Sequence, residues 1–451
     1  MAMTTGGRGN WSGRTGFILA AAGSAVGLGN IWGFPNQVAS NGGAAFLIVY
    51  TLCCFLVGYP VMVAELSVGR ATAKNPVGAF RKLAPGSFIM PLIGFWGVIV
   101  GMAILAFYNV IAGWTLSYVL EEFAQFFGSD TTAALLGATD GGIKSAIFAL
   151  VFMLGTITIV AGGVSGGIER ATKTMMPLLI GILLLMTVYV LTRDGSGEGL
   201  RQYLLPDFSK INTGLILSAL GQAFFSLSLG MGALITYGSY LDRKMNIPQA
   251  AGFVTLADFS IAFLAGLLIL PAMYVAQSRG VQIVDDSGAL IQSTGLVFNV
   301  LPELFHQIGG ITGLVVGVMF FFLLTIAALT STISLLEVPV SYLVDEHGMN
   351  RKKASILMGA IIGAISLIIA FDPSLIGLFV TIFNNFGLPV GGLMICLFVA
   401  YYWKTEKALK EMEDGYEDIS GSAFASIWPI FVKFICPLLI ALVFLNTLGV
   451  I

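Results

Sequence analysis

The chain has 451 residues, of which 57% are hydrophobic and only 10% are charged, and its mean hydropathy is +0.92. A soluble domain carries about 25% charged residues, so these values exclude a large soluble protein with charged outer faces. The formal net charge of −2 gives no reason to expect a nucleic-acid partner. We therefore expect an all-α integral membrane protein embedded in a lipid bilayer.

Apolar runs long enough to cross a bilayer follow one another along the whole chain. Because a spanning helix needs about 20 apolar residues, the sequence predicts about eleven transmembrane helices. The earlier ones are expected near residues 14–40, 44–70, 88–124, 143–163 and 168–192. The later ones are expected near residues 213–241, 247–277, 310–346, 353–371, 375–402 and 424–449.

Most lysine and arginine residues fall in alternate connections between these runs. They precede the first run and follow the second, fourth, sixth, eighth and tenth, as at Arg14, Lys74, Lys173, Lys244 and Lys352. Because cytoplasmic loops are enriched in these residues, the pattern predicts a multi-pass protein with a cytoplasmic N-terminus. Lys433 lies inside the last run, so either it snorkels toward the cytoplasmic face or that span starts later.

The first run is interrupted at its middle by the sequence GSAVGLGNIWGFP, residues 23–35. Glycine, asparagine and proline are poor choices for the interior of a helix. Close packing of small residues explains isolated glycines, but it does not explain Asn30 at the depth of Gly27 and Gly29. Unwound backbone is tolerated in a membrane only where it lines a cavity. The window therefore predicts a broken helix at a binding site.

A second interruption lies midway through the sixth run, in the sequence FFSLSLGMGA, residues 224–233. The first and sixth runs correspond to each other if the chain consists of two five-helix repeats. Paired interruptions at corresponding positions are typical of secondary transporters, whose substrate and ions bind at the breaks. Half-helix N-termini there can bind a carboxylate, and freed carbonyls can bind Na⁺.

The motifs GSAVGLGNIWGFP, NGGAAF, AELSVGR, GQAFFSLSLGMG and ALTSTISLLE resemble the neurotransmitter:sodium symporter family over about residues 8–400. The resemblance implies a LeuT-type 5+5 inverted-repeat bundle with the first and sixth helices broken at mid-membrane. It implies a symporter in a bacterial cell (inner) membrane, not an enzyme, that imports hydrophobic (aliphatic and aromatic) L-amino acids with sodium by alternating access. Proton-coupled amino acid transport by the same fold, or an ion channel, are the alternatives.

The implied organisation has two repeats with short additions. It comprises a cytoplasmic gate segment at 1–13, the first repeat at 14–192, an extracellular loop at 193–212, the second repeat at 213–402, a cytoplasmic loop at 403–423 and an eleventh helix at 424–451. The oligomeric state stays open.

The resemblance implies two co-transported Na⁺ ions, each held by oxygen atoms. The first site would use the Ala25 carbonyl and the side chains of Asn30, Ser226 and Asp258. The second would use the carbonyls of Gly23, Val26 and Ala327 with the hydroxyls of Thr330 and Ser331. Taken alone, the sequence LTST is as consistent with a helix whose hydroxyls bond its own carbonyls.

Asp258 lies well inside an apolar span, where an ionisable residue is a functional candidate. Chloride-dependent relatives carry asparagine at the matching position, so we expect transport that needs no chloride, with Tyr50 and Gln222 as hydrogen-bond partners of Asp258. The alternatives are a protonated, packed carboxyl or one that exchanges protons during transport. Two further carboxylates are expected in supporting roles, Glu65 bonding the unwound first helix and Glu337 bonding near the sixth-span break.

The substrate-binding residues are also carried over from the resemblance. The substrate carboxylate would meet the Leu28 and Gly29 amides and the Tyr108 hydroxyl, and its amino group would face oxygens near Ala22, Ala25, Phe225 and Ser228. The side-chain pocket would be lined by Ser24, Ile104, Phe225, Met231, Ser331 and Leu335. Aromatic and methionine residues are more often plain core in a membrane helix, and only the match to the family's site selects these.

The gates are expected on both sides of that site. The cytoplasmic gate would pair Arg8 with Asp345, supported by Trp11 and Tyr240, and Gly167 with Pro177 would let the fifth helix unwind. An ordinary proline kink is the alternative to that unwinding. The family's outer ion pair is missing, because its positions hold Gly33 and, in the tenth span, the asparagines 384 and 385. Outer closure is then expected to depend on Phe225 over Tyr108 and on the outer loops.

Overall fold

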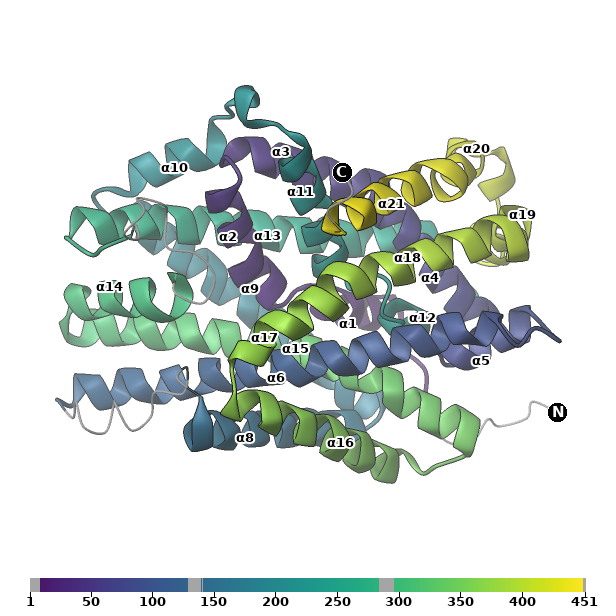
Figure 1. The fold of residues 1–451 in the computed structure, drawn as a ribbon, viewed down its shortest axis with the longest axis horizontal. Coiled ribbons are helices and arrows are strands. Elements are labelled where there is room, and N and C mark those ends of the chain that lie inside the picture. The colour runs from purple at the N-terminus through teal and green to yellow at the C-terminus, as the bar shows by residue number, and fades with distance from the viewer. Residues whose placement is uncertain (1–8, 129–138, 140, 284–295, 449–451) are drawn as a thin grey trace.

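The computed structural model describes residues 9–128, 139, 141–283 and 296–448, and every regular element in these ranges is a helix (Figure 1). The first half contains α1 (Arg14–Ala25), α2 (Phe34–Ser40), α3 (Ala44–Cys53), α4 (Tyr59–Thr72), α5 (Pro76–Leu83), α6 (Met90–Phe126), α8 (Gly142–Ala161), α9 (Arg170–Leu191) and α10 (Ser196–Leu204). The second half contains α11 (Thr213–Ser226), α12 (Ala233–Gly238), α13 (Ile247–Ser278), α14 (Leu301–Ile308), α15 (Gly310–His347), α16 (Arg351–Phe371), α17 (Ser374–Phe379), α18 (Leu388–Leu397), α19 (Thr405–Glu413), α20 (Ala423–Ile430) and α21 (Cys436–Thr447).

Within the described residues, nine helices are long and apolar enough to cross a membrane. They are Ala44–Thr72, Met90–Phe126, Gly142–Ala161, Val164–Leu191, Ile247–Ser278, Gly310–His347, Arg351–Phe371, Ser374–Glu413 and Ala423–Leu445. Each corresponds to a predicted span, which confirms the all-α membrane fold. The helix of the tenth span is longer than predicted, because it continues into the region expected to be the cytoplasmic loop 403–423.

The two remaining spans are the broken ones, as the sequence predicts. The first is a bent pair, Arg14–Ala25 and Gly29–Ser40, whose axes differ by 49°. The sixth is divided into α11 and α12, and the backbone between them takes positive φ angles of 56° at Ser228, 80° at Gly230 and 77° at Gly232. Glycine accepts such angles without strain, whereas serine seldom adopts them.

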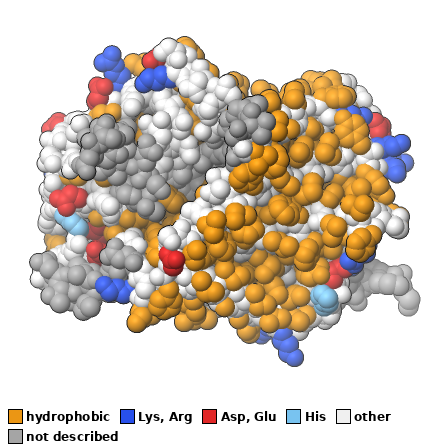
Figure 2. All heavy atoms as spheres, in the orientation of Figure 1, with side chains coloured by type: hydrophobic (Ala, Val, Ile, Leu, Met, Phe, Trp, Pro, Cys, Tyr) orange, Lys and Arg blue, Asp and Glu red, His pale blue; other side chains and the backbone are white. Residues whose placement is uncertain are grey.

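The broken helices pack against several of the unbroken ones. The long helices α6 and α15 pack along each other, with α8 and α16 against them (Figure 1). The broken helices contact this group and their own neighbours, since α1 touches α13 and α15 while α12 touches α4. Hydrophobic side chains form a broad band on the visible face, and charged side chains lie mainly toward its two ends (Figure 2). This distribution suits a protein surrounded by lipid.

The basic connections meet at one end of the bundle. Arg70, at the end of α4, pairs with Glu411 of α19 at 3.1 Å. Arg243, after α12, pairs with Asp414 at 3.2 Å. These contacts place the connections after the second, sixth and tenth spans on the same side, as the charge pattern predicts. That this side is the cytoplasm stays a prediction.

Lys433, for which the sequence allows two interpretations, reaches this same end. Its Nζ lies 3.2 Å from Oε1 of Glu406 in α19, and its side chain is 27% exposed. The last span begins at Ala423, so it does not start later than predicted. Lys433 therefore snorkels along the apolar surface to a carboxylate at the membrane end.

Candidate functional site

A cavity lies where the two broken helices face α6 and α15. Its wall consists of Ser24, Ala25, Gly27, Gly29, Ile104, Tyr108, Phe225, Ser228, Met231, Ser331 and Leu335. These include all the predicted substrate-binding residues except Ala22 and Leu28. Gly27 is not among the predicted site residues, although it lies in the motif that predicts the break. A Cβ on Gly27 would lie 2.2 Å from Ser331 Oγ and 2.6 Å from the Tyr108 hydroxyl, so a larger residue would displace these two groups.

Ala22 is one of the two predicted substrate residues that do not line the cavity. Its carbonyl accepts the amide of Val26 at 2.6 Å, because α1 is still helical at this point. Ala25, close to where the helix ends, lines the cavity instead. Leu28 is buried behind the wall, and its amide donates to the Tyr108 hydroxyl at 2.8 Å. The groups expected to hold a carboxylate are therefore adjacent.

The side chains expected at the first sodium site form one buried network. Asp258 Oδ1 accepts hydrogen bonds from Asn30 Nδ2 at 2.7 Å and from Ser226 Oγ at 2.9 Å. The Tyr50 hydroxyl donates to Asp258 Oδ2 at 3.4 Å, as the sequence predicts. Asp258 is fully buried, and no lysine or arginine in the described part of the chain forms an ion pair with it. A buried carboxylate among neutral groups favours a small cation beside it.

The residues expected at the second sodium site also converge. Thr330 Oγ1 lies 2.9 Å from the Ala327 carbonyl and 3.3 Å from the Val26 carbonyl, and Ser331 Oγ lies 3.4 Å from the latter. A Cβ on Gly23 would lie 3.4 Å from Thr330 Cβ, so Gly23 is a direct neighbour. The hydroxyls thus bond carbonyls of their own helix and also reach the broken first helix. The bonds within α15 are those of the simpler interpretation of the LTST motif, and sodium binding by these groups stays a prediction.

Two polar side chains support the unwound segments differently from the sequence prediction. Gln222, expected beside Asp258, donates its amide to the Gly29 carbonyl at 2.7 Å. Glu65, expected to bond the first helix, instead accepts the amide of Gly230 in the sixth-span break at 2.7 Å. Glu65 therefore satisfies a backbone amide within the sixth-span break. Gln222 adds a second bond to the Gly29 carbonyl, which also accepts the Phe34 amide.

The predicted cytoplasmic gate is only partly within the described residues. Arg8 lies outside them, so its pairing with Asp345 stays a prediction. Asp345 accepts a hydrogen bond from the Asn75 amide at 2.7 Å. Trp11 donates its indole N–H to the Tyr237 carbonyl at 3.0 Å, which attaches the N-terminal segment to the end of the sixth span.

Tyr240, predicted at the same gate, takes part in a network that the sequence motifs do not predict. Its hydroxyl donates to Glu337 Oε1 at 2.6 Å, and Arg351, at the start of α16, pairs with the other oxygen of Glu337. Glu337 is fully buried, so its charge is balanced by Arg351. The sequence does contain a signal for this ion pair. Glu337 is a carboxylate inside an apolar span, and the next helix begins with the basic residue Arg351.

Gly167 and Pro177 lie in the fifth span as predicted, with Gly167 in a wider turn, Val164–Glu169, and Pro177 inside α9. A Cβ on Gly167 would lie 2.0 Å from the Ile159 carbonyl. The glycine therefore has a packing role at the end of α8. Unwinding of this helix stays a prediction.

Of the two positions of the family's outer ion pair, the one in the tenth span, at Asn384 and Asn385, lines a polar cavity, whereas Gly33 does not. The wall of this cavity consists of Gln37, Leu217, Ser218, Gly221, Gln222, Asn384, Asn385 and Val443. Asn384 Nδ2 donates to Asn385 Oδ1 at 3.2 Å, and a Cβ on Gly33 would lie 3.5 Å from the Gln222 amide. Asparagine amides therefore stand where the resemblance places the aspartate, and the Gln222 amide lies next to the position of the arginine.

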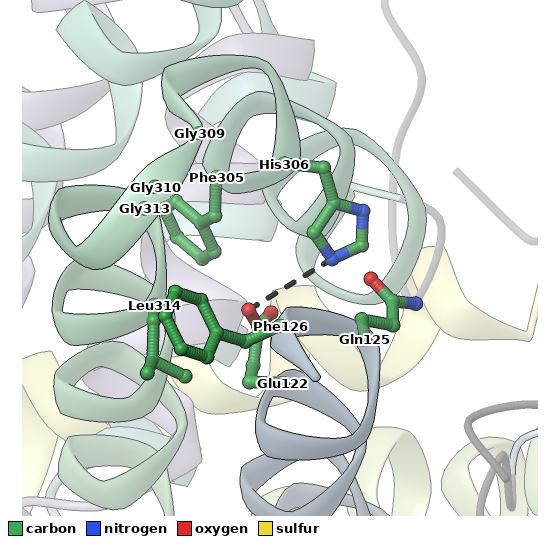
Figure 3. A pocket seen from close by; sticks show the side chains of 9 residues that line it. All are labelled: Glu122, Gln125, Phe126, Phe305, His306, Gly309, Gly310, Gly313 and Leu314. Carbon is green, nitrogen blue, oxygen red and sulfur yellow. Dashed lines mark ion pairs between the residues drawn. The ribbon is translucent and has the colours of Figure 1, made fainter. Parts of the chain in front are cut away.

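A separate cavity lies at the C-terminal end of α6, where Glu122 points toward His306 of α14 (Figure 3). The Nε2–Oε2 distance is 3.8 Å, and burial lowers the pKa of His306 below its usual value. The imidazole is therefore neutral at pH 7, so it does not form a charged pair with Glu122. This cavity shares no lining residue with the one between the broken helices.

Two broken helices that enclose a cavity, with oxygen clusters beside it, define the class of secondary transporters with inverted repeats. A family model described as "Sodium:neurotransmitter symporter family" matches residues 8–133 and 125–451. The chain belongs to this family of sodium-dependent transporters. The family identified from the sequence motifs is thereby confirmed.

The chain is similar over nearly its whole length to other sodium-dependent transporters. It is 36% identical to "Uncharacterized sodium-dependent transporter YhdH" of Bacillus subtilis over 98% of each chain. It is 32% identical to an uncharacterized sodium-dependent transporter of Haemophilus influenzae, again over 98% of each chain. The crystal structure of MhsT in complex with L-phenylalanine matches with a TM-score of 0.84 and 40% identity, covering 98% of this chain and 100% of that one. The fold is therefore the predicted LeuT type.

Proposed function

We propose that this protein is a symporter that uses sodium to import hydrophobic aliphatic and aromatic L-amino acids by alternating access. The observation that carries the proposal is a cavity walled by both broken helices, with a buried carboxylate network on one side and hydroxyls and carbonyls on another. Substrate and ions bound there would lie between the two gates. The similarity to MhsT, whose structure is a complex with L-phenylalanine, supports an amino acid as substrate.

The cavity offers hydrogen-bond partners to both charged groups of an amino acid, the carboxylate and the ammonium group. The Tyr108 hydroxyl and the amide of Gly29 would bind the carboxylate, and the carbonyls of Ala25 and Phe225 would accept from the ammonium group. The opposite wall is apolar, formed by Ile104, Met231 and Leu335. Such a wall favours a hydrophobic side chain, because a charged one would lose its hydration without a partner.

Sodium would bind beside this cavity at both oxygen clusters. At the first, the formal charge of Asp258 would balance the ion, and the substrate carboxylate would complete the shell. At the second, Thr330 and Ser331 of α15 would be joined to the broken first helix through the ion. Because Asp258 supplies a negative charge, we expect no need for chloride, which other members of the family use.

Uptake of labelled leucine and tryptophan into proteoliposomes tests this function. Uptake should occur with an inward sodium gradient and should be lost when choline replaces sodium. It should persist when gluconate replaces chloride. Equal uptake in choline, driven by a pH gradient, would instead indicate proton coupling and overturn both sodium assignments.

Met231→Phe should narrow the range of substrates. Met231 is buried in the cavity wall, and its flexible side chain can repack around ligands of different shape. A rigid ring there should lower tryptophan uptake about tenfold relative to leucine uptake. Met319→Phe, on the half-buried face of α15, is the control. An unchanged ratio of tryptophan to leucine uptake in Met231→Phe would refute this role.

A further inference from the structure

The hydroxyl groups in the cavity wall are not equivalent. The Tyr108 hydroxyl accepts the Leu28 amide at 2.8 Å, and Ser228 Oγ donates to the Ser24 carbonyl at 2.9 Å. Ser331 Oγ lies 3.4 Å from the Ala327 carbonyl of its own helix. The Oγ of Ser24 alone among them has no hydrogen-bond partner within the described residues, although this residue is only 2% exposed.

This situation is unusual for a serine in an apolar helix. Such hydroxyls commonly bond a carbonyl of the preceding turn. Ser67 does so, donating to the Val63 carbonyl at 2.7 Å. Ser24 lies at the end of α1, next to the break, and makes no such bond. A buried hydroxyl without a partner is unfavourable, so its place in the cavity wall is best explained by a ligand that pairs with it.

The remaining side-chain wall limits what that ligand group can be. Ile104, Met231 and Leu335 offer no hydrogen-bonding oxygen or nitrogen. A ring N–H buried against them would lose its hydrogen bond to water unless a wall hydroxyl replaced it. Among the side-chain hydroxyls of the wall, that of Ser24 is the one with no hydrogen-bond partner in the described part of the protein.

We propose that Ser24 is a specificity-determining residue whose Oγ accepts the indole N–H of tryptophan. This inference rests on the proposed function, because it assigns a preferred substrate class to the same cavity. Leucine and phenylalanine enter the cavity through apolar contact alone. Tryptophan gains an additional hydrogen bond, which the cavity cannot give to an isostere without the N–H.

The test compares tryptophan with its benzothienyl isostere, in which sulfur replaces the ring N–H. Both compete with labelled leucine for sodium-driven uptake into proteoliposomes. The wild type should bind tryptophan about two- to tenfold more tightly than the isostere, the usual gain from one neutral hydrogen bond. In Ser24→Ala this ratio should fall to one. In Ser67→Ala, a serine outside the cavity whose hydroxyl bonds its own helix, the preference should remain.

The ratio of tryptophan binding to isostere binding in the wild type tests the role of the indole N–H even if a variant fails to fold. Equal competition by tryptophan and the isostere in the wild type overturns the inference, while sodium-driven leucine uptake in the same vesicles leaves the proposed function standing. A preference that survives in Ser24→Ala also overturns it. A lack of sodium-driven uptake in the wild type would refute the proposed function itself.

Discussion

Asp258→Asn should reduce sodium-driven amino acid uptake in chloride-free medium at least about tenfold. The Asp258 carboxylate is fully buried, and its hydrogen-bond partners are neutral. It is therefore the one group of this network that can balance the charge of a bound cation. Leaving one partner of a buried ion pair uncompensated costs several kcal/mol, well beyond the ~1.4 kcal/mol that a tenfold loss requires. Uptake is measured over a range of sodium concentrations.

The asparagine variant keeps the shape of the side chain, so the fold should persist. Chloride should restore part of the uptake if the lost charge is the cause, because an anion can then enter the same neighbourhood. Sodium dependence identical to that of the wild type, with or without chloride, would contradict the role assigned to Asp258.

Asp207→Asn is the matched control for this variant. Hydrogen bonds from Ser209 lower the pKa of Asp207 below its usual value, so this exposed carboxylate is ionised at neutral pH. Both substitutions therefore remove one negative charge from the protein. Only the one at Asp258 should change sodium dependence, because an exposed loop charge is screened by water and salt.

Gly391→Ala should abolish transport and lower the thermal stability of the protein. Gly391, in α18, packs directly against the sixth-span break, where an added Cβ would lie 2.1 Å from the Gly230 carbonyl oxygen. Backbone cannot move aside as a flexible side chain can, so α18 and the break must separate. Overpacking of this kind typically costs about 1–3 kcal/mol. The shift would also disturb the bond between Gly230 and Glu65, which holds the break in place.

Gly377→Ala provides the control in the same span. No heavy atom lies within 4 Å of a Cβ built on Gly377, and alanine is the better helix former. Its melting temperature and leucine uptake should match or exceed those of the wild type. Wild-type uptake and stability in Gly391→Ala would show that the close contact at the sixth-span break is not required.

The sequence predicts the spans and both breaks correctly because each depends on local composition. Hydropathy alone finds the long apolar helices, and glycine with asparagine at mid-membrane marks the unwound segments. The partner of Glu65 could not be predicted in this way. Its carboxylate bonds Gly230 rather than the first helix because the choice depends on how two distant helices are rotated against each other.

The same limit applies to residues one helical turn apart. Ala22 and Ala25 have the same side chain, and only the point where α1 ends decides which of them lines the cavity. The pairing of Glu337 with Arg351 likewise requires the packing of α15 against the start of α16. Motif resemblance therefore predicts which segments form a site. Which atoms of these segments face each other depends on how the helices are rotated, and this cannot be predicted from the motifs.

Substrate-stimulated sodium flux tests the central claim, coupled transport, most directly. Radioactive sodium is followed into proteoliposomes with and without external leucine, at fixed membrane potential. We expect little sodium entry without leucine and a large increase with it, at a constant ratio of sodium to leucine transported. Sodium entry that is independent of leucine would indicate a channel, and leucine entry without sodium entry would contradict sodium symport.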